Sequence, residues 1–107
     1  MMAIWKATSV MQTPQLKLVR WRVYEGEDGA RHFVGYNITE GEGRVSSAVT
    51  SFDPATRRGV TASGRVYALV GPAGYDADAE YVWRGWLTVN VGAYHDVTDS
   101  VAASIAG

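Results

Sequence analysis

The strongest constraint on the fold of this chain is a change of hydrophobic period at the segment Gly71-Pro72-Ala73-Gly74. Before this segment, apolar and polar residues alternate, which is the pattern of strands that bury one face. After it, apolar residues recur every three or four positions, which is the pattern of an amphipathic helix. The helical stripe consists of Ala79, Val82, Trp83, Trp86, Val89 and Asn90. We therefore predict strands followed by one helix over about residues 76–91, opened by Asp76, Asp78 and Glu80, which a helix dipole favours.

Two alternating runs, 16–24 and 31–38, predict a β-hairpin joined by the turn sequence EGEDGA. Placing Tyr24 opposite Arg31 would set Trp21 against Val34 and Val19 against Tyr36. One face of the hairpin would then be almost wholly apolar, which is what fixes a strand register.

The same pattern continues beyond the hairpin, through 44–52, where Val45 and Val49 extend the apolar face. A turn over 53–59 leads to a further strand over 60–70, which Gly64 is expected to bend. The predicted fold class is α+β: an antiparallel meander of four to five strands with one helix (about 76–91) packed on one face. Trp83 and Trp86 are expected to pack onto the sheet face that carries Trp21, Val34, Tyr36 and Val49. The tail after Tyr94 fits either a short helix capped by Asp99 or an edge strand over 95–101.

The chain has 107 residues, which is the size of one domain. Residues 1–13 are expected to form a loose leader or a short edge strand, and 14–107 a single domain. The chain contains no Cys, which excludes disulfides and thiolate chemistry and makes a cytoplasmic, bacterial-type protein the default expectation. Its net charge of -1 provides no global attraction for nucleic acid or an anionic membrane, and no apolar run is long enough to span a bilayer.

The residues that could carry chemistry are few. His32 and His95 are the only imidazoles, and a zinc site without Cys would need both of them and a carboxylate. His95 and Asp96 near Ser100 supply the residue types of a hydrolytic triad, but neighbours in sequence do not by themselves give its geometry. The run 76–80 opens like a calcium loop yet lacks the required Gly and the closing Glu. We predict no metal, no cofactor and no enzymatic activity.

The predicted sheet has a second face, opposite its core, which would mix arginines with aromatic residues. We expect it to be the partner-binding surface, because these residue types are enriched at interface hot spots. A second basic patch is expected around the strand junction. The first surface consists of Arg20, Arg22, Tyr24, Arg31 and Phe33, flattened by Gly35, Ser46 and Ala48, and the second of Arg57, Arg58 and Arg65.

Two other interpretations of this face stand beside partner binding. Its arginines could simply pair with the carboxylates of the turns, and we favour this solvated surface over nucleic-acid binding. Alternatively, the face could stack single-stranded bases and hold their phosphates, as several RNA and DNA binders do.

The pattern T-x-S-G-R-x-Y-x-L from Thr61 to Leu69, followed by D-x-D-A-x-Y-V-W-x-x-W from Asp76 to Trp86, resembles small uncharacterised proteins of proteobacterial plasmids, prophages and integrative elements. The resemblance covers about a quarter of the chain and brings no established activity. It implies an accessory protein of a mobile element, of which binders and inhibitors of host defence are more typical than enzymes.

The sequence therefore predicts a small non-enzymatic protein-interaction module, acting on an unidentified protein partner. The alternative is single-stranded nucleic-acid binding through the Arg/aromatic face. An exposed edge strand and a flat face would also permit a homodimer.

Overall fold

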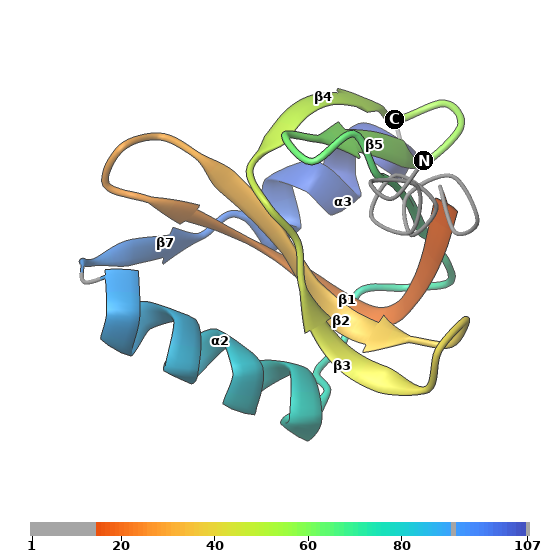
Figure 1. Ribbon diagram of the computed structural model, residues 1–107. Coiled ribbons are helices and arrows are strands. Elements are labelled where there is room, and N and C mark those ends of the chain that lie inside the picture. Colours follow the sequence, from red (N-terminus) through yellow and green to blue (C-terminus); the bar gives the residue numbers. More distant parts are fainter. Residues whose placement is uncertain (1–14, 91, 107) are drawn as a thin grey trace, which may run out of the picture.

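The computed structural model describes residues 15–90 and 92–106, which form an α+β fold built on a strongly bent, mostly antiparallel sheet (Figure 1). The predicted leader over 1–13 lies outside the described residues. In chain order the elements are β1 (Gln15–Gly26), β2 (Arg31–Asn37), β3 (Glu42–Val45), β4 (Val49–Asp53), β5 (Arg58–Thr61), β6 (Val66–Leu69), α2 (Ala77–Asn90), β7 (Tyr94–Asp96) and α3 (Thr98–Ala106).

The strand order is β3-β2-β1-β6-β5-β4, and β7 pairs with the far end of β1. The α+β class with a mostly antiparallel sheet is confirmed, but the prediction of four to five strands in a meander is wrong. The sheet has seven strands, and β1 runs parallel to β6. The additional strands arise where the expected strand over 60–70 is a hairpin turning at Gly64, whose φ is 88°, and where the expected strand over 44–52 divides into β3 and β4.

Strand β1 carries a bulge that changes which side chains share a face. Val19 pairs with Tyr36 as predicted, but Arg22, not Trp21, pairs with Val34, because Arg20 adopts a φ of 49° and adds one residue to β1. The predicted register is therefore wrong from the bulge to the turn, where Tyr24 pairs with His32. No alternation rule indicates where such a residue is inserted.

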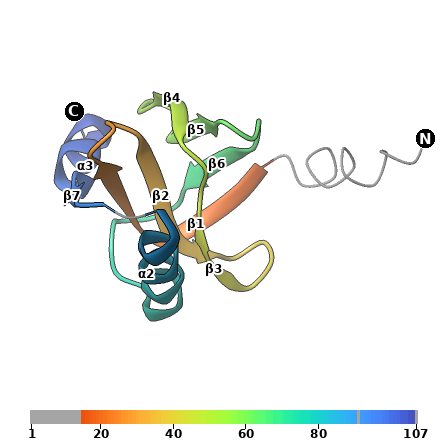
Figure 2. The ribbon, with the colours of Figure 1, turned by 60° about the vertical axis from the view of Figure 1, so that its left-hand side comes forward.

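The two faces of the β1–β2 hairpin are both buried, each under a different helix (Figures 1 and 2). Val23 and Phe33 point into a core closed by β4, β6 and the α3 residue Val101. Tyr24 and Val34 point the other way, toward α2. The hairpin is thus the central layer of the molecule, and neither of its faces is open to solvent as a whole.

Helix α2 begins where the sequence predicts, since Asp76 caps it by accepting a 3.0 Å hydrogen bond from the Ala79 backbone N–H. The predicted end at residue 91 lies outside the described residues. Its buried face is rotated from the predicted stripe: Glu80 is buried and Val89 is 80% exposed. Trp83 packs on Val34 as expected, whereas Trp21 and Val49, also expected beneath this helix, belong to the other core.

The tail contains a shortened edge strand and a helix, where the sequence left open a strand over 95–101 or a helix capped by Asp99. Asp99 lies inside the first turn of the helix and does not cap it. Residues 94–96 form the edge strand β7, and α3 follows immediately. Asp96 makes the transition by accepting a 2.9 Å hydrogen bond from the Thr98 backbone N–H. The Thr98 hydroxyl oxygen in turn accepts a 2.9 Å bond from the Val23 backbone N–H, which fixes the start of α3 to β1.

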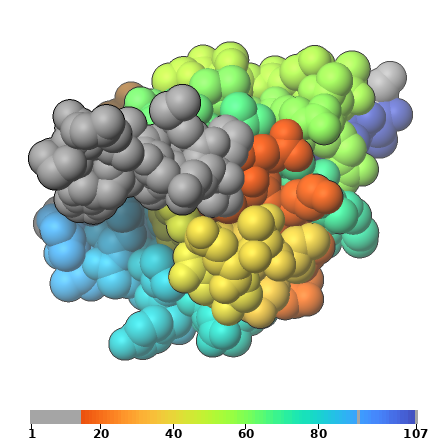
Figure 3. Space-filling model, turned by 45° about the vertical axis from the view of Figure 1, so that its right-hand side comes forward, coloured from red at the N-terminus to blue at the C-terminus, as the bar shows by residue number. Residues whose placement is uncertain are grey.

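Two glycines allow close approaches that hold the layers together. A Cβ on Gly43 would lie 2.4 Å from the Ala79 backbone nitrogen, so α2 rests directly on the backbone of β3. Figure 3 shows this side, where the β2–β3 hairpin (yellow) lies against α2 (cyan). A Cβ on Gly59 would lie 2.4 Å from the Phe33 ring, whose space it would occupy. Neither described helix is long and apolar enough to cross a membrane.

Candidate functional site

The predicted Arg/aromatic surface does not exist as one exposed face. Tyr24 is 5% exposed and faces α2, while Phe33 is 1% exposed and faces the opposite core. Gly35 and Ser46, which were expected to flatten this surface, are also buried. The prediction of a contiguous, solvent-facing sheet surface is wrong, because α2 covers one face of the hairpin and α3 helps to close the core on the other, while the bulge at Arg20 changes which side chains share a face.

The arginines of that set instead make contacts within the chain. The solvated-surface interpretation expected them to pair with carboxylates of the turns, but their partners lie on strands and at the start of a helix. Arg20 donates to the capping carboxylate of Asp76 at 2.9 Å and lies over the Tyr36 ring. Arg31 donates to Glu25 at 2.8 Å. Arg22 donates to the Gly74 carbonyl at 2.9 Å and also forms an ion pair with Asp96. Each of the three therefore ties a strand to another part of the fold.

The second predicted patch is divided between structural contacts in the same way. Arg57 donates to the carbonyl oxygens of Leu69 and Gly71 from a backbone with a φ of 61°. Arg58 donates to the Gln15 side chain at 3.1 Å, and Arg65 is partly buried beside the β5–β6 turn.

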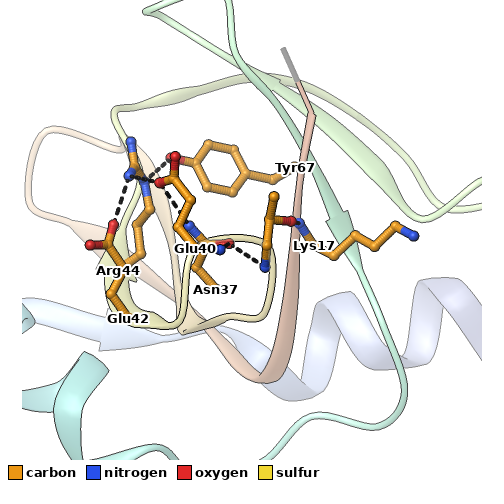
Figure 4. Close-up of polar contacts among 7 residues, drawn as sticks. Lys17, Asn37, Glu40, Glu42, Arg44 and Tyr67 are labelled. Atoms are coloured by element: carbon orange, nitrogen blue, oxygen red, sulfur yellow. Dashed lines mark hydrogen bonds and ion pairs between the residues drawn. The ribbon is translucent and has the colours of Figure 1, made fainter. Parts of the chain in front are cut away.

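A further polar cluster surrounds Arg44 on β3 (Figure 4). Its guanidinium donates to the Tyr67 hydroxyl at 3.0 Å and to Glu42 at 3.1 Å, and it lies 3.6 Å from Glu40. Burial lowers the pKa of Arg44, but these hydrogen bonds outweigh it and the net shift is upward. Asn37 completes the cluster by accepting the Thr39 backbone N–H at 2.9 Å. Because these polar groups form hydrogen bonds with one another, we interpret the cluster as a structural one that stabilises the β2–β3 turn.

The histidines give no sign of a metal or a triad. The His32 Nδ1 lies 2.9 Å from the buried Ser46 carbonyl oxygen, whereas His95 is exposed on β7. Asp96 pairs with Arg22 and Thr98 and makes no bond to His95. No group of three or more His, Cys, Asp or Glu side chains able to hold a metal ion occurs within 15–90 and 92–106.

The structure instead reveals a groove of about 280 Å³ where three separate segments meet. One wall is the last two turns of α2, the second is the β1–β2 turn over 26–28, and the third is the segment 92–94 that leads into β7. We call it the α2–β7 groove. Its lining residues are Gly26, Glu27, Asp28, Trp83, Trp86, Leu87, Asn90, Gly92, Ala93 and Tyr94.

Aromatic rings form the base of the α2–β7 groove. Trp83, fully buried, stacks on Trp86 with ring centroids 5.0 Å apart and planes 8° apart. Tyr94 meets the Trp83 ring edge-on at 5.2 Å, and Tyr24 packs on Trp83 at 5.0 Å. Tyr94 remains 39% exposed and Trp86 partly exposed, so the ring cluster reaches solvent within the groove. Rings fixed in this way offer large contact area at little cost in conformational entropy.

The rim of the groove is acidic. Glu27 and Asp28 both line it and are exposed, and no Lys or Arg is among its described lining residues. The C-terminal end of α2 adds its partial negative charge, and the last turn of this helix contains no basic residue. Aromatic faces are also electron-rich. All three features favour a cation over an anion.

A buried hydrogen bond holds the groove from below. The Tyr24 hydroxyl donates to the Glu80 carboxylate at 2.6 Å, joining β1 to α2. Burial, followed by this bond, raises the pKa of Tyr24 above its usual value, so its hydroxyl remains a donor. Asp96 holds the third wall in place, because its ion pair with Arg22 anchors β7. Burial acts to raise the pKa of Asp96, but hydrogen bonds from Thr98 and Arg22 outweigh burial and the net shift of this pKa is downward.

One polar atom in the ring cluster has no hydrogen-bond partner. The Trp83 indole N–H is buried, and no acceptor contacts it in the described part of the chain. By contrast, the equally buried Trp21 donates its indole N–H to the Gly71 carbonyl at 3.0 Å. The position of the Trp83 ring is therefore determined by packing against other rings and not by a hydrogen bond of its indole N–H.

Comparison with protein-family models, curated proteins and solved structures gave no match for this chain. The site therefore has to be assigned from its own chemistry.

Sequence reasoning missed the α2–β7 groove because its walls are distant in the chain. It placed Trp83 and Trp86 in the core and treated 25–30 only as a turn. The available signal was the surplus of acidic residues in that turn, beyond what a tight connection requires. Only the return of the chain through β7 brings this turn beside the end of α2.

Proposed function

We propose that this protein is a small non-enzymatic protein-interaction module whose contact surface is the α2–β7 groove. The observation that carries the proposal is the combination, in one groove, of partly exposed rings with an acidic rim whose carboxylates form no ion pair within the described residues. Most of the other charged side chains described above serve the architecture of the fold. Aromatic residues in a pocket surrounded by polar groups are the usual composition of an interface hot spot.

The resemblance to small proteins of mobile elements supports the same kind of function. We extend the proposal to an accessory or inhibitory protein of such an element, acting by contact with a host or element-encoded protein. We rank the alternative of single-stranded nucleic-acid binding below this proposal, since Tyr24 and Phe33 are buried and Arg20, Arg22 and Arg31 form ion pairs within the chain.

The test is affinity capture from a lysate of the source organism, followed by mass spectrometry. A Glu27→Lys variant reverses one charge on the groove rim, and Asp78→Lys makes the same change at the exposed start of α2, away from the groove. We expect the wild type and Asp78→Lys to capture the same partner and Glu27→Lys to lose it. Equal capture by all three proteins would contradict the groove as the contact surface.

A further inference from the structure

We infer that the α2–β7 groove binds the guanidinium group of an arginine side chain presented by the partner protein. This inference rests on the proposed function, because it names the chemical group that the groove receives. It follows from three properties of the groove: its charge, the form of its aromatic walls and its size.

The charge of the groove selects a cation. Glu27 and Asp28 stand on one wall, the C-terminal end of α2 forms another, and no described lining residue carries a positive charge. Other carboxylates near the hairpin are already paired, Glu25 with Arg31 and Asp96 with Arg22. Glu27 makes no such ion pair within the described residues. A cation entering the groove therefore meets a carboxylate that needs no release from an internal partner.

The aromatic walls favour a planar cation over a compact one. Trp86 and Tyr94 are the rings that remain partly exposed in the groove. Trp86 lies nearly parallel to the buried Trp83, and Tyr94 stands almost perpendicular to it, so the two exposed rings present flat surfaces in two orientations. A guanidinium stacks on such faces, is weakly hydrated, and points a fork of N–H donors at carboxylates. A lysine ammonium is a strongly hydrated point charge and gains less from stacking. Arginine is therefore the side chain that uses both the rings and the acidic rim.

The size of the groove fits one side chain. Its volume of about 280 Å³ lies just under the range of about 300–1,000 Å³ that is usual for sites of drug-sized ligands and cofactors. Leu87 adds an apolar wall suited to the methylene groups of a long side chain. The groove therefore has room for one long side chain presented by a polypeptide.

The test uses the full chain, labelled with ¹⁵N, and three capped tripeptides of the form glycyl-X-glycine, in which X is arginine, citrulline or lysine. Citrulline has the shape of arginine without the charge. We expect the arginine peptide to produce saturable shifts of the Trp86 indole and of the Glu27 and Tyr94 amides, at low salt. The citrulline peptide should bind at least about tenfold more weakly, a difference of about 1.4 kcal/mol.

Glu27→Gln should weaken arginine binding several-fold, and Asp78→Asn, which removes one exposed charge at the other end of α2, should leave it unchanged. The ¹⁵N spectrum of each variant shows directly whether it is folded. Equal affinity for arginine and citrulline, equal affinity for arginine and lysine, or shifts confined to residues outside the groove would each overturn the assignment.

This result can be separated from the proposed function. If Glu27→Lys loses the captured partner but the arginine peptide does not bind, the groove remains the contact surface and the arginine assignment is wrong. If the peptide binds but capture does not depend on the groove, the groove recognises arginine and the proposed function fails.

Discussion

The hydroxyl of Tyr24 donates a 2.6 Å hydrogen bond to the carboxylate of Glu80, and this bond joins the central strand β1 to α2 beneath the α2–β7 groove. Both residues are buried, so the bond pairs a carboxylate that would otherwise be costly to remove from water.

Tyr24→Phe would leave the Glu80 carboxylate without this donor. We expect the free energy of unfolding to fall by about 1.5–3 kcal/mol, the range for a hydrogen bond to a charged group. Glu80→Gln keeps an acceptor for the Tyr24 hydroxyl and should cost less. Urea unfolding of both variants makes the comparison, and a smaller loss for Tyr24→Phe than for Glu80→Gln would contradict the role given to the bond.

Two glycine substitutions separate close packing from helix propensity. Gly43→Ala places a methyl group against the Ala79 backbone and should destabilise the protein by about 1–3 kcal/mol, because α2 must move away from β3. At Gly85 on α2 an added methyl group meets no other atom, so Gly85→Ala should stabilise the protein by about 0.5–1 kcal/mol through the higher helix propensity of Ala. Thermal unfolding monitored by circular dichroism distinguishes these opposite signs. If both changes shift the melting temperature in the same direction, the packing of α2 on β3 differs from this description.

The two buried tryptophans Trp21 and Trp83 differ in their indole N–H groups. Replacing Trp21 by Phe removes a hydrogen bond to Gly71, whereas replacing Trp83 by Phe removes an unpaired buried donor. We therefore expect Trp21→Phe to cost about 1 kcal/mol more than Trp83→Phe in chemical unfolding. A greater cost for Trp83→Phe would show that its ring packing outweighs the missing bond.

The lowered pKa of Asp96 makes the attachment of β7 sensitive to acid. Its ionised form is favoured in the folded state, so the stabilisation is complete above the ordinary carboxyl range and is lost as the pH falls through the lower folded pKa. Asp96→Asn should therefore be less stable than the wild type at pH 7, and the difference should shrink below a pH of about 4. Melting temperatures across this range provide the test. A difference that does not change with pH would exclude the ion pair with Arg22 as its source.

The sequence predicts the parts of this fold that depend on local pattern. The alternation before Gly71, the turn over 25–30 and the helix begun by Asp76 all follow from side-chain period and capping chemistry. The number of strands was underestimated, because Gly64 in the expected strand over 60–70 is compatible with both a bend and a hairpin turn. Only pairing of Val60 with Val66 distinguishes the two.

The error over the binding face has one physical origin. The extra residue at Arg20 shifts the alternation of β1, so that Leu16, Leu18, Trp21 and Val23 share one core, and α3 then covers that side. A bulge depends on the fit between two strands and their cores, which a single strand does not encode. The groove could not be predicted for a related reason, since its three walls meet only through long-range topology.

The most direct test of the central claim is hydrogen–deuterium exchange on this protein bound to its captured partner, compared with the free protein. The α2–β7 groove as the contact surface predicts slower exchange over 26–28 and over the described residues of 83–94, with no change in the β5–β6 turn near Arg65. Protection confined to 57–65 and to the exposed arginines of the hairpin, with none at the groove, would contradict it.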